Sequence, residues 1–172
     1  MQVFVSGATG FIGIQLVKRL LSQGDRVHAL YRSEAKADLI RLPGVSLFKG
    51  DILDPASLET AMKGCEAAFH TAAFAGVWSK DPGMIFRLNV DGALLVIATA
   101  RKLGLDRVVL TSTAGILGPS LQDPVNESSP PPSSFFTLYE ESKFRLEQSL
   151  LGDRNKHPEV VIVNPEALPS RS

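Results

Sequence analysis

Two side chains whose types and spacing could move a proton, the Tyr139 phenol and the Lys143 ammonium, lie four residues apart. In a helix this spacing puts them one turn apart, on the same face as Leu146 and Leu150. A charge on such an apolar face needs polar partners, and the phenol would be one of them. The ammonium would lower the pKa of the phenol, whose usual value of about 10 leaves almost no phenolate at neutral pH. The pair therefore predicts acid–base chemistry, whereas a packing tyrosine beside a lysine with a buried stem would show the same spacing.

A second candidate site is the segment Gly-Ala-Thr-Gly-Phe-Ile-Gly, which follows a short apolar run and opens an amphipathic stretch. Gly7 would permit a tight turn, and Gly10 would let the backbone approach a pyrophosphate at the positive N-terminus of a helix. Gly13 precedes Val17 and Leu20 by four and seven residues, so it shares their inward face, where helix and sheet could approach closely. This order of strand, turn and helix predicts a dinucleotide-binding site, and a glycine turn that binds nothing is the alternative.

The choice between NAD and NADP is normally made at the end of the second strand, where an acid would bind the ribose hydroxyls of NAD. No acid occupies that place, which holds Arg32 and Ser33 instead. A guanidinium and a hydroxyl suit a phosphate dianion, so the sequence favours NADP(H), with NAD(H) as the other option. A solvated surface arginine is the alternative interpretation of Arg32.

The elements that must position these groups follow from alternating apolar runs and helical stretches, which predict an α/β fold with a parallel sheet covered on both faces. We expect a Rossmann-type doubly wound sheet in the order 3-2-1-4-5-6, with ligands at the carboxyl ends of its strands. The proline-rich stretch 118–134 is predicted to be a long loop beside the site. Strands are predicted near 2–6, 26–31, 45–49, 67–71, 107–112 and 159–163, and helices near 11–23, 34–41, 55–63, 83–103 and 138–151.

Composition narrows the function classes. The 172 residues fit one domain, and 18 basic against 18 acidic residues leave no net charge to bind nucleic acid. The longest apolar runs are shorter than a bilayer-spanning helix needs, so no membrane partner is expected. Cys65 has no second cysteine to pair with and the first residues resemble a strand, which indicates a reducing, cytoplasmic setting. No metal is expected, because the three histidines share no metal-ligand spacing.

The glycine segment, with Ser6 in place of the usual threonine before it, resembles the extended short-chain dehydrogenase/reductase family. That family includes nucleotide-sugar epimerases and dehydratases, dihydroflavonol reductases and 3β-hydroxysteroid dehydrogenases. The resemblance implies hydride transfer between a nicotinamide and a carbonyl or hydroxyl substrate. It also implies that Tyr139 is the acid/base, that Lys143 orients the ribose, and that Thr113 holds the substrate oxygen. Ser112 competes with Thr113 for that role, and these hydroxyls could instead satisfy the loop backbone.

The resemblance also assigns supporting residues. Asn89 would support Lys143, although a purely structural hydrogen bond explains a buried amide equally well. Asp51 would accept a hydrogen bond from the adenine amine or else only cap the following turn, His70 is expected to be packed, and Trp78 is expected either to contact substrate or simply to pack. The implied cofactor site comprises Gly7, Thr9, Gly10, Phe11, Ile12, Gly13, Arg32, Asp51, Ile52, Ala72, Ala73, Tyr139, Lys143, Asn164 and Pro165.

The resemblance covers only the amino-terminal half of a typical member. Residues 1–165 are predicted to form the NAD(P)-binding domain, and 166–172 lack the pattern that leads into a substrate lobe. We therefore expect an open pocket and uncovered apolar surface, and a homodimer is compatible with the fold. Two functions follow: a reductase or epimerase for a small-molecule substrate, dihydroflavonol-like or nucleotide-sugar, or a truncated dinucleotide-binding module without turnover. Dehydration ranks lower, because Ala114 and Gly115 follow Thr113 where a dehydratase usually adds an acid pair.

Overall fold

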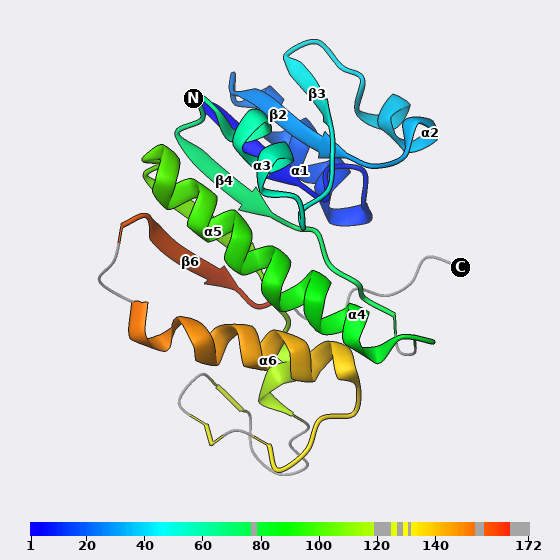
Figure 1. Ribbon diagram of the computed structural model, residues 1–172, viewed down its shortest axis with the longest axis vertical. Coiled ribbons are helices and arrows are strands. Elements are labelled where there is room, and N and C mark those ends of the chain that lie inside the picture. Colours follow the sequence, from blue (N-terminus) through cyan, green and yellow to red (C-terminus); the bar gives the residue numbers. More distant parts are fainter. Residues whose placement is uncertain (77–78, 119–124, 127–128, 131, 154–156, 166–172) are drawn as a thin grey trace.

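The computed structural model describes all residues except 77–78, 119–124, 127–128, 131, 154–156 and 166–172. The described residues form one six-stranded sheet in the order β3-β2-β1-β4-β5-β6, and every neighbouring pair of strands is parallel (Figure 1). The predicted strand order is confirmed. The strands are β1 (Gln2–Ser6), β2 (Arg26–Tyr31), β3 (Val45–Lys49), β4 (Ala67–His70), β5 (Arg107–Thr111) and β6 (Glu159–Val163).

The sheet carries helices on both faces, as the alternating pattern predicts. Helix α1 packs on one face beside Val3 and Val5, whereas α3, α5 and α6 pack on the other beside Phe4 and Ala68 (Figure 1). The helices are α1 (Phe11–Ser22), α2 (Glu34–Ala37), α3 (Pro55–Met62), α4 (Pro82–Phe86), α5 (Gly92–Leu103) and α6 (Leu138–Leu150).

Two predicted helices differ from the structure. The helix predicted near 34–41 is only α2 followed by a 3₁₀ turn, η1 (Asp38–Ile40). The helix predicted near 83–103 is interrupted by a π-helical turn, η2 (Arg87–Asp91), between α4 and α5. The buried positions Ile85, Gly92 and Val96 keep the spacing of an uninterrupted α-helix, so the sequence pattern could not show the π turn. The described residues of the predicted loop 118–134 form no helix or strand, as expected.

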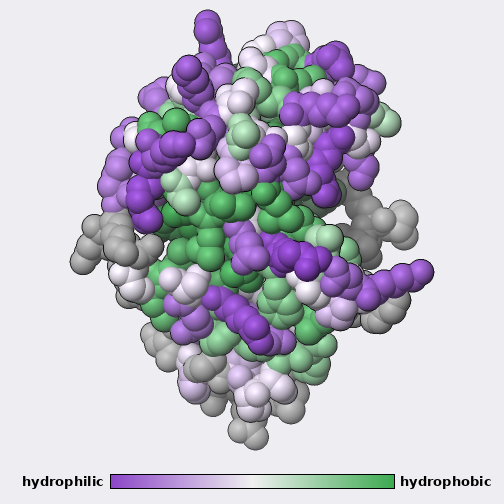
Figure 2. Space-filling view, viewed as in Figure 1, coloured by the Kyte–Doolittle hydropathy of each residue, from purple (hydrophilic) through white to green (hydrophobic). Residues whose placement is uncertain are grey.

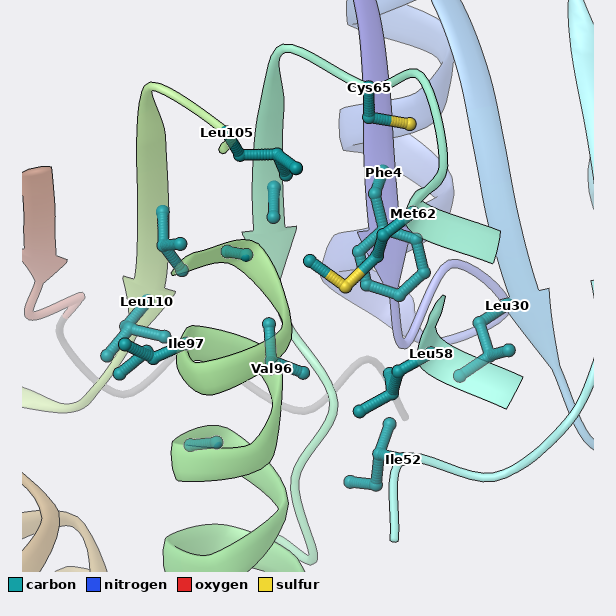
Figure 3. Close-up of a cluster of buried hydrophobic side chains, with 14 of the residues drawn as sticks. Phe4, Leu30, Ile52, Leu58, Met62, Cys65, Val96, Ile97, Leu105 and Leu110 are labelled. Carbon is teal, nitrogen blue, oxygen red and sulfur yellow. The ribbon is translucent and has the colours of Figure 1, made fainter. Parts of the chain in front are cut away.

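The larger core cluster joins the sheet to α3 and α5 beneath the expected ligand edge. Figure 3 shows Phe4 of β1 and Leu110 of β5 directed towards the same layer as Met62 and Val96 of these helices. Phe4, Met62 and Val96 are fully buried. Because such interiors are close-packed, the strand ends that carry the candidate site are held in fixed positions.

Residues Pro82–Leu103 are long and apolar enough, by length and composition alone, to cross a membrane. Their apolar character has a structural explanation, because Ala93, Val96 and Ala100 are fully buried against the sheet. Outer leucines such as Leu94 and Leu95 are half-buried, and Figure 2 shows hydrophobic residues over α5 on this face. The helix therefore has the burial pattern of a core helix with an apolar outer face. The possible homodimer stays a prediction.

Candidate active site

The glycine turn packs against the residues that follow β4 and leads into α1. Gly7 adopts a positive φ of 70°, and its carbonyl accepts a hydrogen bond from the Gly10 N–H at 2.9 Å. A Cβ on Gly7 would lie 2.5 Å from the Ala72 nitrogen, and one on Gly13 would lie 2.1 Å from the Gly7 oxygen. Both glycines are thus required for close packing of backbone on backbone, which confirms the tight turn predicted at Gly7 and the close approach predicted at Gly13, whereas their contact with a cofactor stays a prediction.

The N-terminus of α1 is open to a ligand. Its N-cap residue, Gly10, supplies no side-chain acceptor, and the first turn contains no acidic residue. The first N–H groups of a helix lack intrahelical partners, so those of Phe11 and Ile12 are available to an anion. A Cβ on Gly10 would meet only the Gly7 oxygen, at 3.2 Å, so the turn presents bare backbone to the cleft. This donor set fits a pyrophosphate.

Two cavities meet at this turn and share Gly7, Gly10, Thr71 and Ala73. The first has a volume of about 300 Å³ and lies at the carboxyl ends of β2 and β3. Its walls include Arg32, Ser33, Lys36, Ile52 and Ala72. The second has a volume of about 260 Å³ and extends towards α6; its walls include Phe11, Ile12, Thr111, Tyr139 and Lys143. Residues far apart in the sequence therefore line one elongated cleft at the carboxyl edge of the sheet.

The polar end of the first cavity holds Arg32, whose side chain is 68% exposed. Its guanidinium lies 3.8 Å from the Asp51 carboxylate, which is a long, solvent-exposed ion pair. Asp51 also accepts a hydrogen bond from the Leu53 N–H at 2.9 Å, so this carboxylate caps the following turn, and its contact with adenine stays a prediction. Lys36, which the sequence analysis did not single out, adds a second cation to the same cavity wall.

Helix α6 presents Tyr139 and Lys143 to the second cavity. The helix begins at a capping box in which the side chains of Thr137 and Glu140 each bind the backbone N–H of the other residue. Lys143 is 1% exposed, and its Nζ donates to the Thr111 carbonyl at 2.7 Å, where β5 ends. Nζ also lies 5.8 Å from the centre of the Tyr139 ring. The expected pairing of phenol and ammonium at one cavity is thus present.

The electrostatics of the pair differ from the expectation. Burial lowers the pKa of Lys143 to about 8, against the attraction of Glu147, which raises it. The pKa of Tyr139 is raised, first by burial and then by the Glu140 carboxylate. The expected lowering of the Tyr139 pKa by Lys143 is therefore wrong for this structure, because loss of hydration dominates at a half-buried phenol.

Asn89 connects the π-helical turn η2 to two other parts of the site. Its fully buried amide accepts from the Phe74 N–H at 2.7 Å and donates to the Phe74 carbonyl at 3.1 Å. It also donates to the Ser142 hydroxyl at 2.8 Å, and that hydroxyl donates to the Tyr139 carbonyl at 2.7 Å. Asn89 therefore fixes the segment after β4 against α6, next to Lys143. Ser142 was missed by the sequence analysis, since its position between charged residues gave no sign of burial.

The hydroxyl-bearing turn follows β5. The Thr113 hydroxyl accepts from the Gly115 N–H at 3.2 Å at the start of the 3₁₀ turn η3 (Ala114–Leu117), whereas Ser112 is 2% exposed and its hydroxyl lies in the interior. Thr113 is not among the residues that line the two cavities. The side chain of Asn164 donates to Glu147 rather than lying along the cleft, and the Pro165 carbonyl accepts from the Ala114 N–H.

His70 is packed, as expected. It is 1% exposed and its Nδ1 lies 2.7 Å from the Ser6 hydroxyl. Burial, followed by the charge of Lys143, lowers the pKa of His70 to about 3, so the ring is neutral. Among the described residues no group of acidic, histidine and cysteine side chains could hold a metal ion. Trp78 and the tail 166–172 lie outside the described residues.

Comparison with known proteins identifies relatives of this chain. A sequence model of the NAD dependent epimerase/dehydratase family matches residues 3–170. A putative dihydroflavonol 4-reductase of Synechocystis sp. is 35% identical over 171 residues, which cover 94% of this chain and 48% of that protein. A 2-alkyl-3-oxoalkanoate reductase of Shewanella oneidensis is 36% identical over 149 residues, covering 86% of this chain and 38% of that protein.

The solved structures agree with these sequences. The UDP-glucose 4-epimerase of Thermus thermophilus, in complex with NAD, superposes with a TM-score of 0.81 at 28% identity, covering 95% of this chain and 54% of that one. The present chain thus spans about half the length of the relatives it matches. By the family match over nearly its whole length, the chain belongs to the NAD-dependent epimerase/dehydratase family, the extended short-chain dehydrogenase/reductase group that its motifs resemble.

Proposed function

We propose that this chain binds a nicotinamide dinucleotide and forms the catalytic domain of a reductase or epimerase for a carbonyl or hydroxyl substrate. The observation that carries the proposal is the second cavity, in which the glycine turn and the Tyr139–Lys143 pair line one space. The reductases and the epimerase that it resembles support the same classes of reaction.

Each residue has a definite task in the proposed reaction. When bound, the nicotinamide supplies or accepts the hydride at the reacting carbon. Because the raised pKa of Tyr139 keeps the phenol protonated at neutral pH, Tyr139 donates a proton to the carbonyl oxygen in the reducing direction. Lys143 donates one N–H to the Thr111 carbonyl and has further N–H donors that would hold the ribose hydroxyls. Since the Thr113 hydroxyl accepts from Gly115, its own hydrogen is free to bind the substrate oxygen.

We further propose that the dinucleotide is NADP(H). Arg32, Ser33 and Lys36 line the first cavity near the end of β2, where the 2′-phosphate of NADP would lie. The ion pair of Arg32 with Asp51 is long and exposed, so exchanging it for a phosphate dianion costs little. Ile52 lines the same cavity and would pack on the adenine ring.

The direct test measures binding and turnover separately on the 172-residue chain. NADPH binding is followed by its fluorescence, and turnover by its oxidation in the presence of dihydroflavonols, 3-oxoalkanoates and other carbonyl compounds. We expect Tyr139→Phe to retain binding and to lose about two to four orders of magnitude in turnover. Absence of dinucleotide binding would refute the proposal. Binding without NADPH oxidation, and without conversion of a nucleotide-sugar into its epimer, would identify a dinucleotide-binding module instead.

A further inference from the structure

Hydrogen bonds of Asn164, the residue after β6, join α6 to the Thr113 turn. None of the catalytic roles proposed above involves them. The Asn164 side-chain nitrogen donates to a Glu147 carboxylate oxygen at 2.9 Å and to the Thr113 carbonyl at 3.4 Å. These three residues come from three separate parts of the chain. We infer that Glu147 and Asn164 are positioning residues for the proposed reaction: they hold the Thr113 turn against α6, and Glu147 places a negative charge one helical turn from Lys143.

The positioning role follows from the hydrogen bonds that hold the Thr113 turn. The Thr113 carbonyl also accepts from the Ile116 N–H at 3.3 Å, and Ala114 is bound to the Pro165 carbonyl. The Asn164 amide adds a link from this turn to the helix that carries Tyr139 and Lys143, beside the bond of Lys143 to the Thr111 carbonyl and the packing of Gly115 on Glu140. This link limits how far the Thr113 turn can move relative to α6, and catalytic groups must be held within about 0.5 Å of a productive geometry.

The electrostatic role follows from helical spacing. Glu147 lies four residues after Lys143, so both side chains occupy one face of α6. Glu147 is half-buried. Of the groups on other elements that interact with Lys143, the His70 ring is neutral and the Thr111 carbonyl is uncharged. The Tyr139 phenol on α6 is protonated as well. Glu147 is the group that raises the pKa of Lys143 against the burial that lowers it.

The test of the charge uses the chain without any dinucleotide. The Lys143 side chain is labelled with ¹³C, assigned by its loss in Lys143→Arg, and titrated by NMR. The wild-type midpoint is expected near the pKa of about 8. Glu147→Gln keeps an oxygen that accepts from Asn164 but removes the charge, so its midpoint is expected to fall by about one pH unit. Glu141→Gln is the matched control, because it removes a charge from the exposed pair with Arg145 on the same helix and leaves the midpoint in place.

The test of the positioning role uses amide hydrogen exchange. In Asn164→Ala the amides of Gly115 and Ile116 are expected to exchange about tenfold faster, while those of β1 keep their protection. An unchanged midpoint in Glu147→Gln or unchanged exchange in Asn164→Ala would overturn the corresponding half of the inference. The inference rests on the proposed function, but both measurements are made on the chain without a bound cofactor. Failure of the wild type to bind NADPH would therefore refute the function while leaving these results to be judged separately.

Discussion

At the scale of single residues, the site is governed by the cost of burying charge. Lys143 is almost fully buried, and its carbonyl partner, Thr111, does not restore the hydration that the ammonium loses. Tyr139 responds to the same loss in the opposite sense, since its charged form is the anion. Without a ligand, the pair therefore holds a protonated phenol beside an ammonium that deprotonates near pH 8. That state is suited to donating a proton in a reduction.

The two tyrosines of the chain make this state measurable. In a Tyr31→Phe background, ultraviolet absorbance of phenolate reports on Tyr139 alone, and its midpoint is expected above the usual pKa of 10. Glu140→Gln is expected to lower the Tyr139 pKa, because it removes the neighbouring charge while glutamine still completes the capping box. Glu141→Gln should leave the midpoint unchanged. A wild-type midpoint below 10 would contradict the burial argument.

At the scale of elements, the π-helical turn η2 explains how Asn89 reaches the site. A π turn adds a residue to one turn of a helix and displaces the side chains that follow, and such turns are frequent at functional sites. Here the turn places one amide between the Phe74 backbone and the Ser142 hydroxyl, while α4 and α5 continue on either side. The apolar face of α5 stays packed on the core, while the Asn89 amide donates a hydrogen bond to Ser142 of α6.

Removal of the Asn89 amide should reveal this connection. Asn89→Ala leaves the Phe74 N–H and carbonyl without their partner, so the free energy of unfolding is expected to fall by about 2–4 kcal/mol. Asp91→Ala is the control, because Asp91 is exposed in the same turn and its loss should change stability by less than about 0.5 kcal/mol. Urea unfolding measures both, and equal effects of the two substitutions would disprove the bridging role.

The glycine turn predicts a separation between folding and binding. In Gly13→Ala the added Cβ would lie 2.1 Å from the Gly7 oxygen, so α1 must move and the melting temperature should drop steeply. In Gly10→Ala the Cβ lies 3.2 Å from the same oxygen and φ is already −85°, so the fold should persist. That methyl group would occupy the backbone surface facing the cleft, and NADPH should bind about tenfold more weakly. Similar stability of the two variants would show that this division is wrong.

At the scale of the whole molecule, the sequence predicts the sheet better than the contacts at its edge. Alternating strands and helices with right-handed crossovers allow few topologies, so the order of β1 to β6 could be predicted. The bond from Lys143 to the Thr111 carbonyl depends on where β5 ends relative to α6, which no local pattern encodes. Likewise, the bond of the Asn164 side chain to Glu147 could not be predicted, since the direction of a side chain after a strand depends on tertiary packing.

A dinucleotide lying along the cleft would bind to the ends of β1, β2 and β4 and to α6 together, and would so stabilise the folded chain as a unit. Ligand binding raises stability according to its concentration relative to Kd, so the melting temperature should rise more with NADPH than with equal NADH. Arg32→Ala is expected to reduce the NADPH effect to that of NADH, with about tenfold weaker NADPH binding, since only the 2′-phosphate distinguishes the two.

Arg41→Ala is the matched control for that experiment, because it removes an exposed arginine paired with Asp38 outside the walls of the first cavity. It should leave both melting shifts as in the wild type, which separates a local phosphate contact from a change in net charge. Equal wild-type shifts with NADH and NADPH would contradict the NADP preference while preserving dinucleotide binding. A loss of both shifts in Arg32→Ala would show instead that Arg32 supports the fold of the cleft, because NADH has no phosphate for it to bind there.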